Sequence, residues 1–553
     1  MPTSAEAPPI VTVKETLTSV MIAFIMAFVF RGFVIEGFLI PTGSMAPTLL
    51  GKHMRLTGPE TGADFAVGPW DYAGDASSQR PLAVQGGTGS EIKSNDPITG
   101  VEFRETDVPL SAGDRVFVLK YLMGLFEPSR WDVVVFKNPG TRENYIKRLI
   151  GLPEEQVAIV AGDIFARPIN QITPGGERGV EAWEDETWRI QRKPERVQRA
   201  MFQTLFDSLY TPPSAATLGS TYTSPWRGEG DWSGVDSGIT YRQGSPETST
   251  LTWRHTKRPI DDEVAYNWNR LGRQSTRFPA PDVATSLGIE PDSSGVRATA
   301  LLEALGHEYR AEISADQLVL SMRPAPTAEA PDPAWVELDR GVAPRGVLKP
   351  GRVTRVEFWH TDQALSVFID GKLAAGGVEN GAYELTPAER IHSATGRTLE
   401  SLMAQNGAVF SSILGKTAIY RPTKLRWSFQ GAAFTLHRVT LKRDIYYQHH
   451  ASSTTRGAHP NLPVVLNADQ FFVCGDNSPS SLDSRLWRPG AVRGSTGPWG
   501  SAPDPWISDQ VDDTIGVVHR DLFIGKAFVV YFPAPLKDSL LPIPDLGRVR
   551  WIW

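Results

Sequence analysis

Cysteine is almost absent from the chain. Among its 553 residues only Cys474 is a cysteine, so no intrachain disulfide can form and no cysteine-based zinc site is complete. The ten histidines show no HExxH pair and no other spacing typical of metal ligands. We therefore expect neither a metal nor another cofactor.

A basic surface is also missing. The formal net charge is −6 and the pI is near 6.0, which argues against a nucleic-acid partner. Apolar residues make up 41% and charged residues 21% of the chain, as in ordinary folded proteins. At 553 residues the chain is longer than one hydrophobic core usually allows, so two or more structural units are expected.

One long apolar run lies near the N-terminus. Residues 17–30 carry no charge, and extension back through Glu15 and forward past Arg31 gives roughly the 20 residues that span a bilayer. The basic segment and small-residue cleavage site of a secretory signal are missing, which favours an uncleaved anchor. Lys14 and Arg31 balance across the run, so charge favours neither orientation.

Short strands rich in Val, Phe and Ile occur in two separated parts of the chain. The first set comprises residues 114–120, 132–137 and 145–150, and the second comprises 470–474 and 524–532. We predict a mostly β protein: an N-terminal segment with the anchor (1–35) precedes a β-domain whose two parts are residues 36–160 and 451–553.

Residues 161–450, between those parts, are predicted to form an inserted β-rich module. They hold nine of the sixteen tryptophans, and strands alternate with turns, most clearly in residues 353–377, where a turn is expected at Asp362 and Gln363. Residues 220–445 resemble a concanavalin-like jelly-roll sandwich. Such a fold does not imply sugar binding, so the aromatic side chains are expected in the core and an inserted-domain ligand stays open.

Three segments carry residues suited to acyl transfer. In PTGSM, Gly43 allows the backbone amide of Ser44 to face a substrate carbonyl from an exposed turn, although a serine in a turn is usually only a turn residue. In ENYIKRLIGLP, Lys147 shares a strand face with Tyr145 and Leu149, where a lysine can be buried. GDNSPSSLDSR supplies a further serine and a close acid–base pair.

The order of these segments is similar to that of bacterial type I signal peptidases, which are membrane-anchored Ser/Lys proteases. The resemblance rests on IPTGSMAPTL, GDRVFV…RWDVVVFKNP, YIKRLIGLP, GDNSPSSLDSR and GKAFVVYFP…LGRVRWIW, all behind an apolar anchor. It implies the following roles: Ser44 as nucleophile, Lys147 as general base, Thr42 as the hydroxyl of the oxyanion hole, Ser481 as the residue that positions the lysine, and Asp483 with Arg485 as a supporting ion pair.

The resemblance also implies a serine endopeptidase that removes signal peptides from exported preproteins at the bilayer, with one membrane pass and an extracytoplasmic catalytic domain. It requires no cofactor. A lysine acts as base only when neutral, so its pKa must fall by about 2 to 3 from roughly 10.4, which burial in an apolar site achieves. Two other functions are possible alternatives. A self-cleaving repressor would need a DNA-binding helix-turn-helix, which we do not find, and a surface binding protein would use the jelly-roll for recognition and the protease part as a scaffold.

The chain departs from the family pattern at several positions. Thr42 replaces the usual serine but keeps its hydroxyl, and Glu154 and Glu155 stand where the family has Gly-Asp. Residues 58–62 and 96–100 have the rhythm of zinc knuckles without cysteine, and are either a zinc ribbon that lost its metal or two ordinary turns. The ends of the insertion are expected to lie close together, so its removal is expected to leave Ser44 and Lys147 assembled.

Overall fold

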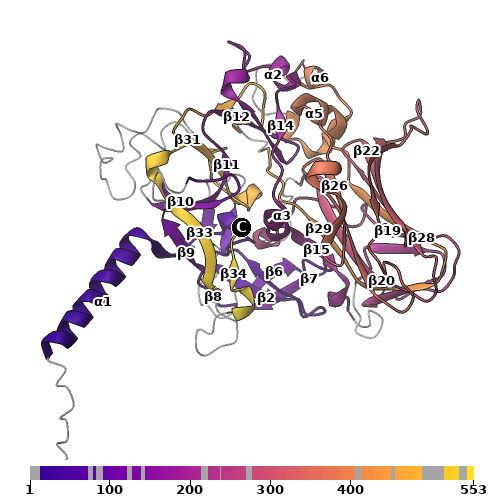
Figure 1. Cartoon of the computed structure of the whole chain (residues 1–553), viewed down its shortest axis with the longest axis horizontal. Coiled ribbons are helices and arrows are strands. Elements are labelled where there is room, and N and C mark those ends of the chain that lie inside the picture. Colours follow the sequence, from indigo (N-terminus) through magenta and orange to yellow (C-terminus); the bar gives the residue numbers. More distant parts are fainter. Residues whose placement is uncertain are drawn as a thin grey trace, which may run out of the picture.

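Strands dominate the chain, and the prediction of a mostly β protein is confirmed (Figure 1). The structure is a computed structural model that describes residues 13–72, 79–81, 91–106, 108–120, 127–138, 143–212, 222–236, 238–268, 277–404, 413–449, 455–487, 516–534 and 545–553. A helix projects from a β-rich body, in which one group of sheets lies near the helix and a sandwich lies farther away.

The projecting helix is α1 (Val13–Phe33). Within it Glu15–Phe33 is long and apolar enough to cross a membrane, and this stretch is not buried in the molecule. Phe24 and Phe28 are 61% and 68% exposed. An apolar helix with such side chains in water would be unfavourable, so this element fits the predicted anchor.

Strands from distant parts of the sequence meet in the sheet nearest α1. Its order is β1 (Ile35–Leu39), β9 (Arg115–Lys120), β33 (Phe523–Phe532), β10 (Val133–Lys137), β11 (Asn144–Gly151), β31 (Gln470–Cys474) and β32 (Val518–His519), with β34 (Arg550–Trp551) paired to β33. Neighbouring strands in it run antiparallel. In Figure 1 the yellow strand β33 accordingly runs beside the purple strands β9 and β10. The domain limits given above stay a prediction.

A small sheet follows β11 directly in the chain. Its order is β14 (Arg189–Ile190), β13 (Asp163–Pro168), β12 (Glu155–Val160) and β30 (Val464–Val465). Short helices α2 (Val180–Glu184), α5 (Pro387–Thr395) and α6 (Leu399–Ala404) lie above it in Figure 1. Helix α3 (Glu195–Met201) leads from this sheet into the sandwich.

The inserted sandwich consists of two antiparallel sheets. One has the order β17 (Trp232–Ser233), β18 (Thr240–Gln243), β29 (Phe434–Arg443), β20 (Val283–Pro291), β25 (Thr354–Thr361), β26 (Ala364–Ile369) and β27 (Lys372–Gly376), with β15 (Gln203–Asp207) paired to β29. The other has β16 (Trp226–Glu229), β19 (Ser249–Trp253), β28 (Lys424–Gln430), β21 (Arg297–Ala304), β22 (His307–Ile313), β23 (Gln317–Pro324) and β24 (Val336–Val342). The fold prediction is therefore confirmed for this module.

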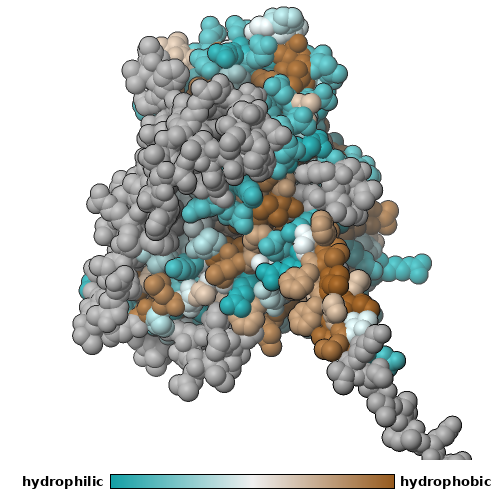
Figure 2. Space-filling model, turned by 90° about the vertical axis from the view of Figure 1, so that its left-hand side faces the viewer, coloured by the Kyte–Doolittle hydropathy of each residue, from teal (hydrophilic) through white to brown (hydrophobic). Residues whose placement is uncertain are grey.

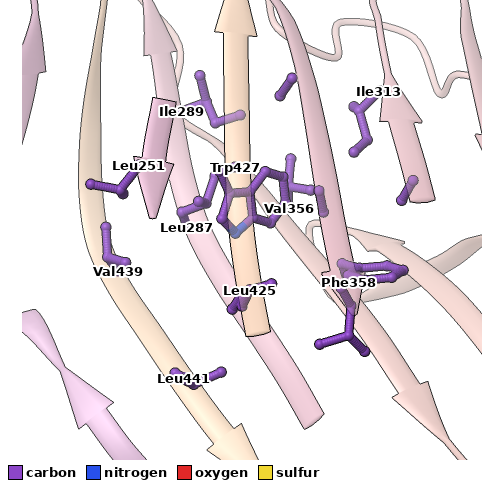
Figure 3. Close-up of a cluster of buried hydrophobic side chains, with 14 of the residues drawn as sticks. Leu251, Leu287, Ile289, Ile313, Val356, Phe358, Leu425, Trp427, Val439 and Leu441 are labelled. Atoms are coloured by element: carbon purple, nitrogen blue, oxygen red, sulfur yellow. The ribbon is translucent and has the colours of Figure 1, made fainter. Parts of the chain in front are cut away.

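Alternating residues of both sheets fill the core of the sandwich (Figure 3). Trp226, Trp253 and Trp427 are fully buried, which agrees with the prediction that aromatic residues belong to the core. The hairpin β25–β26 turns at Asp362 (φ 47°) and Gln363 (φ 55°), where two left-handed residues match the twist of the strands. That turn lies where the sequence predicts it.

The two knuckle-like turns lie side by side between β2 (His53–Thr57) and β3 (Asp64–Val67) and between β6 (Glu91–Asn95) and β7 (Glu102–Thr106). Thr61 Oγ1 donates a hydrogen bond to Asp96 across them. Gly62 and Gly100, at equivalent places, have φ of 66° and 74°. Gly58, Thr61 and Asp96, three of the positions that carry cysteine in a zinc ribbon, thus face one another, and both alternatives, a degenerate ribbon and two ordinary turns, stay open.

Candidate active site

The turn that carries Ser44 follows β1. Ile40 N donates to Asp114 O (2.9 Å), and Gly43–Met45 then form one 3-10 turn, η1. Thr42, just before it, is extended and exposed. Ser44 is only 9% exposed, so the expectation of an exposed serine was wrong. The reason is a second 3-10 turn, η7 (Ser478–Ser480), which packs against η1.

Lys147 points from β11 to the Ser44 turn. It pairs with Val134 in the sheet and is 3% exposed. Its Nζ lies 2.7 Å from Ser44 Oγ and 3.0 Å from Ile146 O, and 5.4 Å from the centre of the Tyr145 ring. The structure therefore brings together two residues that are 103 positions apart in the sequence.

The environment of Lys147 favours its neutral form. Burial, which penalises the ammonium ion, lowers the pKa of Lys147 to about 8, although the negative charge of Asp483 acts in the opposite direction. In about a tenth of the molecules Lys147 is then neutral at pH 7, compared with less than a thousandth for an ordinary lysine. A neutral amine 2.7 Å from a hydroxyl is placed to accept its proton.

Asp483 and Arg485 form a bidentate ion pair close to Ser44 and Lys147, which are together called the dyad below. Arg485 Nε and Nη2 donate to the two carboxylate oxygens of Asp483 at 2.9 and 2.7 Å, and both side chains are fully buried. Burial alone would raise the pKa of Asp483, but Arg485 holds it below its usual range. The Asp483 carboxylate also accepts a hydrogen bond from Gly475 N (2.9 Å), which joins the pair to the end of β31.

The expected hydrogen bond from Ser481 to Lys147 is not present among the described residues. Ser481 is fully buried, and its hydroxyl makes no hydrogen bond to the residues that the structure describes. Ser481 Oγ and Ser44 O both lie against Gly475, where a Cβ would overlap each of them. The predicted role of Ser481 beside the lysine stays a proposal.

The site also contains a second buried ion pair and a side-chain amide that the sequence did not predict. Arg148 donates through Nε and Nη2 to Asp476 at 2.8 and 2.7 Å, with both side chains fully buried. Asn477 N donates to Ser44 O, and Asn477 Nδ2 donates to Gly43 O, each at 3.0 Å. The sequence signals were a charged residue on the face of β11 opposite Lys147 and the Gly-Asp-Asn start of GDNSPSSLDSR.

Two other features of the described residues do not form part of this site. A cavity of about 1000 Å³ is lined by residues of the insertion together with residues before it, such as Pro47 and Thr48, and near the C-terminus, such as Trp551, and neither Ser44 nor Lys147 lines it. Three buried carboxylates could by distance hold a metal ion: Asp163, Asp282 and Asp362.

Cations already accompany these carboxylates. Arg390 Nη2 lies 2.6 Å from Asp163, and Lys193 donates to Asp362. Lys193 Nζ also lies 2.9 Å from Asp444. We interpret the cluster as a buried ion network that joins the β12–β13 hairpin to the sandwich, and assign no metal to it.

Comparison with known proteins finds a family that matches part of the chain. The family model described as signal peptidase, peptidase S26, matches residues 101–186. These residues are thus similar to the peptidase S26 family. The S26 match includes Lys147 and does not extend to Ser44 or to Asp483, and the roles of all three residues remain proposals.

Curated relatives of the S26 region bear the name signal peptidase I. The protein of Buchnera aphidicola (Schizaphis graminum) is 29% identical over 143 residues, which cover 26% of this chain and 30% of that protein. The protein of Rickettsia typhi is 30% identical over 155 residues, which cover 28% and 43%. The chain thus spans less than half the length of these relatives. The predicted family resemblance is confirmed at this level.

Solved structures resemble the chain only distantly. Carbohydrate-binding module CBM66 from Bacillus subtilis is 10% identical, with coverage of 40% of this chain and 96% of that chain and a TM-score of 0.21. A Bacillus subtilis protein of unknown function with a galectin-like fold is 7% identical, with coverage of 44% and 98% and a TM-score of 0.25. These likenesses carry no argument about what the sandwich binds.

Proposed function

We propose that the chain is a type I signal peptidase in which Ser44 is the nucleophile and Lys147 the general base. The observation that carries the proposal is the 2.7 Å contact between Lys147 Nζ and Ser44 Oγ in a buried site. Serine becomes a good nucleophile only when a base removes its proton, and burial of Lys147 raises the share of its neutral form, which can accept that proton.

The reaction follows from the positions of these groups. Lys147 accepts the Ser44 proton while Oγ attacks the carbonyl carbon of the last residue of the signal sequence, and the carbonyl oxygen becomes an oxyanion. The N–H of Ser44 and the exposed hydroxyl of Thr42 would donate to that oxyanion, where one donor is worth about 3 kcal/mol. The ammonium of Lys147 then protonates the leaving amine. Water, deprotonated by Lys147, hydrolyses the ester and restores Ser44.

The membrane surface is the proposed place of action. Helix α1 joins β1 directly, and Lys120 of the neighbouring strand donates through Nζ to Gly32 O (2.8 Å). Leu39 and Trp551 are more than half exposed on the domain that carries the dyad. Figure 2 shows apolar surface along α1 and further apolar patches on the face from which it projects. We propose a single pass with the dyad on the extracytoplasmic side.

A binding protein that keeps the S26 region only as a scaffold is less well supported. Lowering the pKa of Lys147 to about 8 costs about 3 kcal/mol at pH 7 relative to an exposed lysine. A scaffold gains nothing from that cost, because an apolar residue of similar length would fill the site without it. The unfavourable burial is consistent with a chemical role for the amine.

A preprotein with a small residue at the cleavage site should distinguish a signal peptidase from a general protease. We expect the detergent-solubilised protein to release a mature form that begins directly after an Ala-x-Ala sequence. Leucine in place of the last alanine should slow release by about 100-fold, because a shallow pocket excludes the larger side chain. Product masses and rates for the two matched preproteins provide the test. Equal rates, or cuts elsewhere, would contradict the proposal.

A further inference from the structure

A short segment of the insertion lies against the nucleophile turn. In the 3-10 turn η4 (Ala265–Asn267), Tyr266 is 1% exposed, and its ring occupies the space that a Cβ at Gly43 would need. Tyr266 Oη donates to Lys52 O (2.5 Å), and Gly68 N donates to Tyr266 O (2.7 Å). The insertion is thus packed tightly against the residue that precedes Ser44.

The next residue makes a reciprocal amide pair with Asn477. Asn267 Nδ2 donates to Asn477 Oδ1 (2.8 Å), and Asn477 Nδ2 donates to Asn267 Oδ1 (2.9 Å). The second proton of Asn477 Nδ2 goes to Gly43 O (3.0 Å). A flipped Asn477 amide would place its oxygen against the oxygen of Gly43, so Asn267 and Gly43 together fix its orientation.

This arrangement determines the direction of one backbone N–H. In a trans peptide the carbonyl and the N–H point in opposite directions, so the hydrogen bonds that Gly43 O accepts from Asn477 Nδ2 and from Ala46 N (3.0 Å) also orient Ser44 N–H. That N–H is the donor proposed above for the oxyanion. A small rotation of this peptide would move the donor away from the oxyanion, and misplacement of about 1 Å can slow an enzyme by about 100-fold.

Hydrogen bonds to other parts of the insertion hold residues 262–267 in place. Arg443, at the end of β29, donates through Nη2 to Glu263 O (2.7 Å). Asp262 N donates to Phe278 O (3.0 Å), and Phe278 N donates to the Asp262 carboxylate (2.8 Å). Asn267 N donates to Val264 O (2.9 Å). The position of Asn267 therefore depends on the folded insertion.

We propose that Asn267 is a positioning residue for the proposed peptidase, acting through Asn477 on the Gly43–Ser44 peptide. This inference rests on the proposed function, and it makes the insertion a part of the active site. It replaces the expectation that residues 161–450 can be removed while the dyad stays assembled for catalysis.

A double-mutant cycle in the full-length, detergent-solubilised protein tests this inference on a synthetic signal peptide. Asn267→Ala should lower kcat about tenfold with KM within about twofold, because it affects the transition state more than substrate binding. Asn477→Ala should lower kcat about 100-fold. The double variant should be no slower than Asn477→Ala, because Asn267 acts only through that residue.

Two further variants separate positioning from general damage. Asn267→Asp keeps the acceptor for Asn477 Nδ2 and should recover part of the lost kcat. Asn380→Ala, an exposed asparagine of the insertion in α4 (Gly377–Asn380), should retain wild-type kinetics. A wild-type kcat in Asn267→Ala, or losses that simply multiply in the double variant, would overturn the inference and leave the proposed function standing. Wild-type protein that cleaves no faster than Ser44→Ala would overturn both.

Discussion

Lys147→Arg is expected to abolish peptide cleavage at every usable pH. The guanidinium group stays protonated, so it has no lone pair to accept the Ser44 proton. In the wild type, burial lowers the pKa of Lys147 to about 8. The value of kcat/KM should therefore rise about tenfold per pH unit below 8 and level off above it, because the active form is the deprotonated one. Initial rates on a synthetic signal peptide, measured from about pH 6 to about pH 9.5, would record both effects.

A lysine on the neighbouring strand provides the matched control. Lys137, at the end of β10, is exposed, so Lys137→Arg should keep the wild-type rate and the wild-type pH profile. A normal kcat in Lys147→Arg would show that another group is the base. A flat pH profile in the wild type would show that the amine does not titrate in the range that its burial requires.

Among the substitutions proposed for this protein, Asp483→Ala is expected to cause the largest loss of folding stability. It leaves the Arg485 guanidinium fully buried without its carboxylate, and such a change typically costs about 3 to 5 kcal/mol. Native proteins have only about 5 to 15 kcal/mol of total stability, so this is a severe loss. Because the pKa of Asp483 lies below its usual range, the pair stabilises the fold above the unfolded pKa of about 3.9, and this contribution is lost as the pH falls through the folded value.

An exposed ion pair provides the comparison for that measurement. Asp292 pairs with Arg242 at the surface, where both side chains are more than 40% exposed. Asp292→Ala should cost less than about 1 kcal/mol in denaturant unfolding at pH 7. If both variants lost the same small amount of stability, the buried pair would not be the structural support proposed here.

Local chemistry accounts for the parts of the fold that the sequence predicts well. The turn at Asp362 and Gln363 follows from alternating apolar residues on either side of it, and the anchor follows from one uncharged run. Both features depend on neighbours in the chain. The buried aromatic residues follow from the same alternation, because every second side chain of a sandwich strand faces the opposite sheet.

The site is less predictable because its contacts join distant positions. Ser44 and Lys147 are 103 residues apart, and only the ordered motifs of a known family suggested that they meet. Arg148 and Asp476 are 328 residues apart, and Asn267 and Asn477 are 210 apart, with no periodicity to link them. The missing bond between Ser481 and Lys147 has the same origin, because rotamers in a buried network depend on all its members.

The release of a mature preprotein by the wild type and by Ser44→Ala is the most direct test of the central claim. Both proteins are incubated in detergent with a preprotein, and the new N-terminus is sequenced. Ser480→Ala, a buried serine of η7 outside the dyad, is the matched control and should process the preprotein normally. We predict release after the signal sequence by the wild type and the control and none by Ser44→Ala. Equal release by Ser44→Ala would contradict the account.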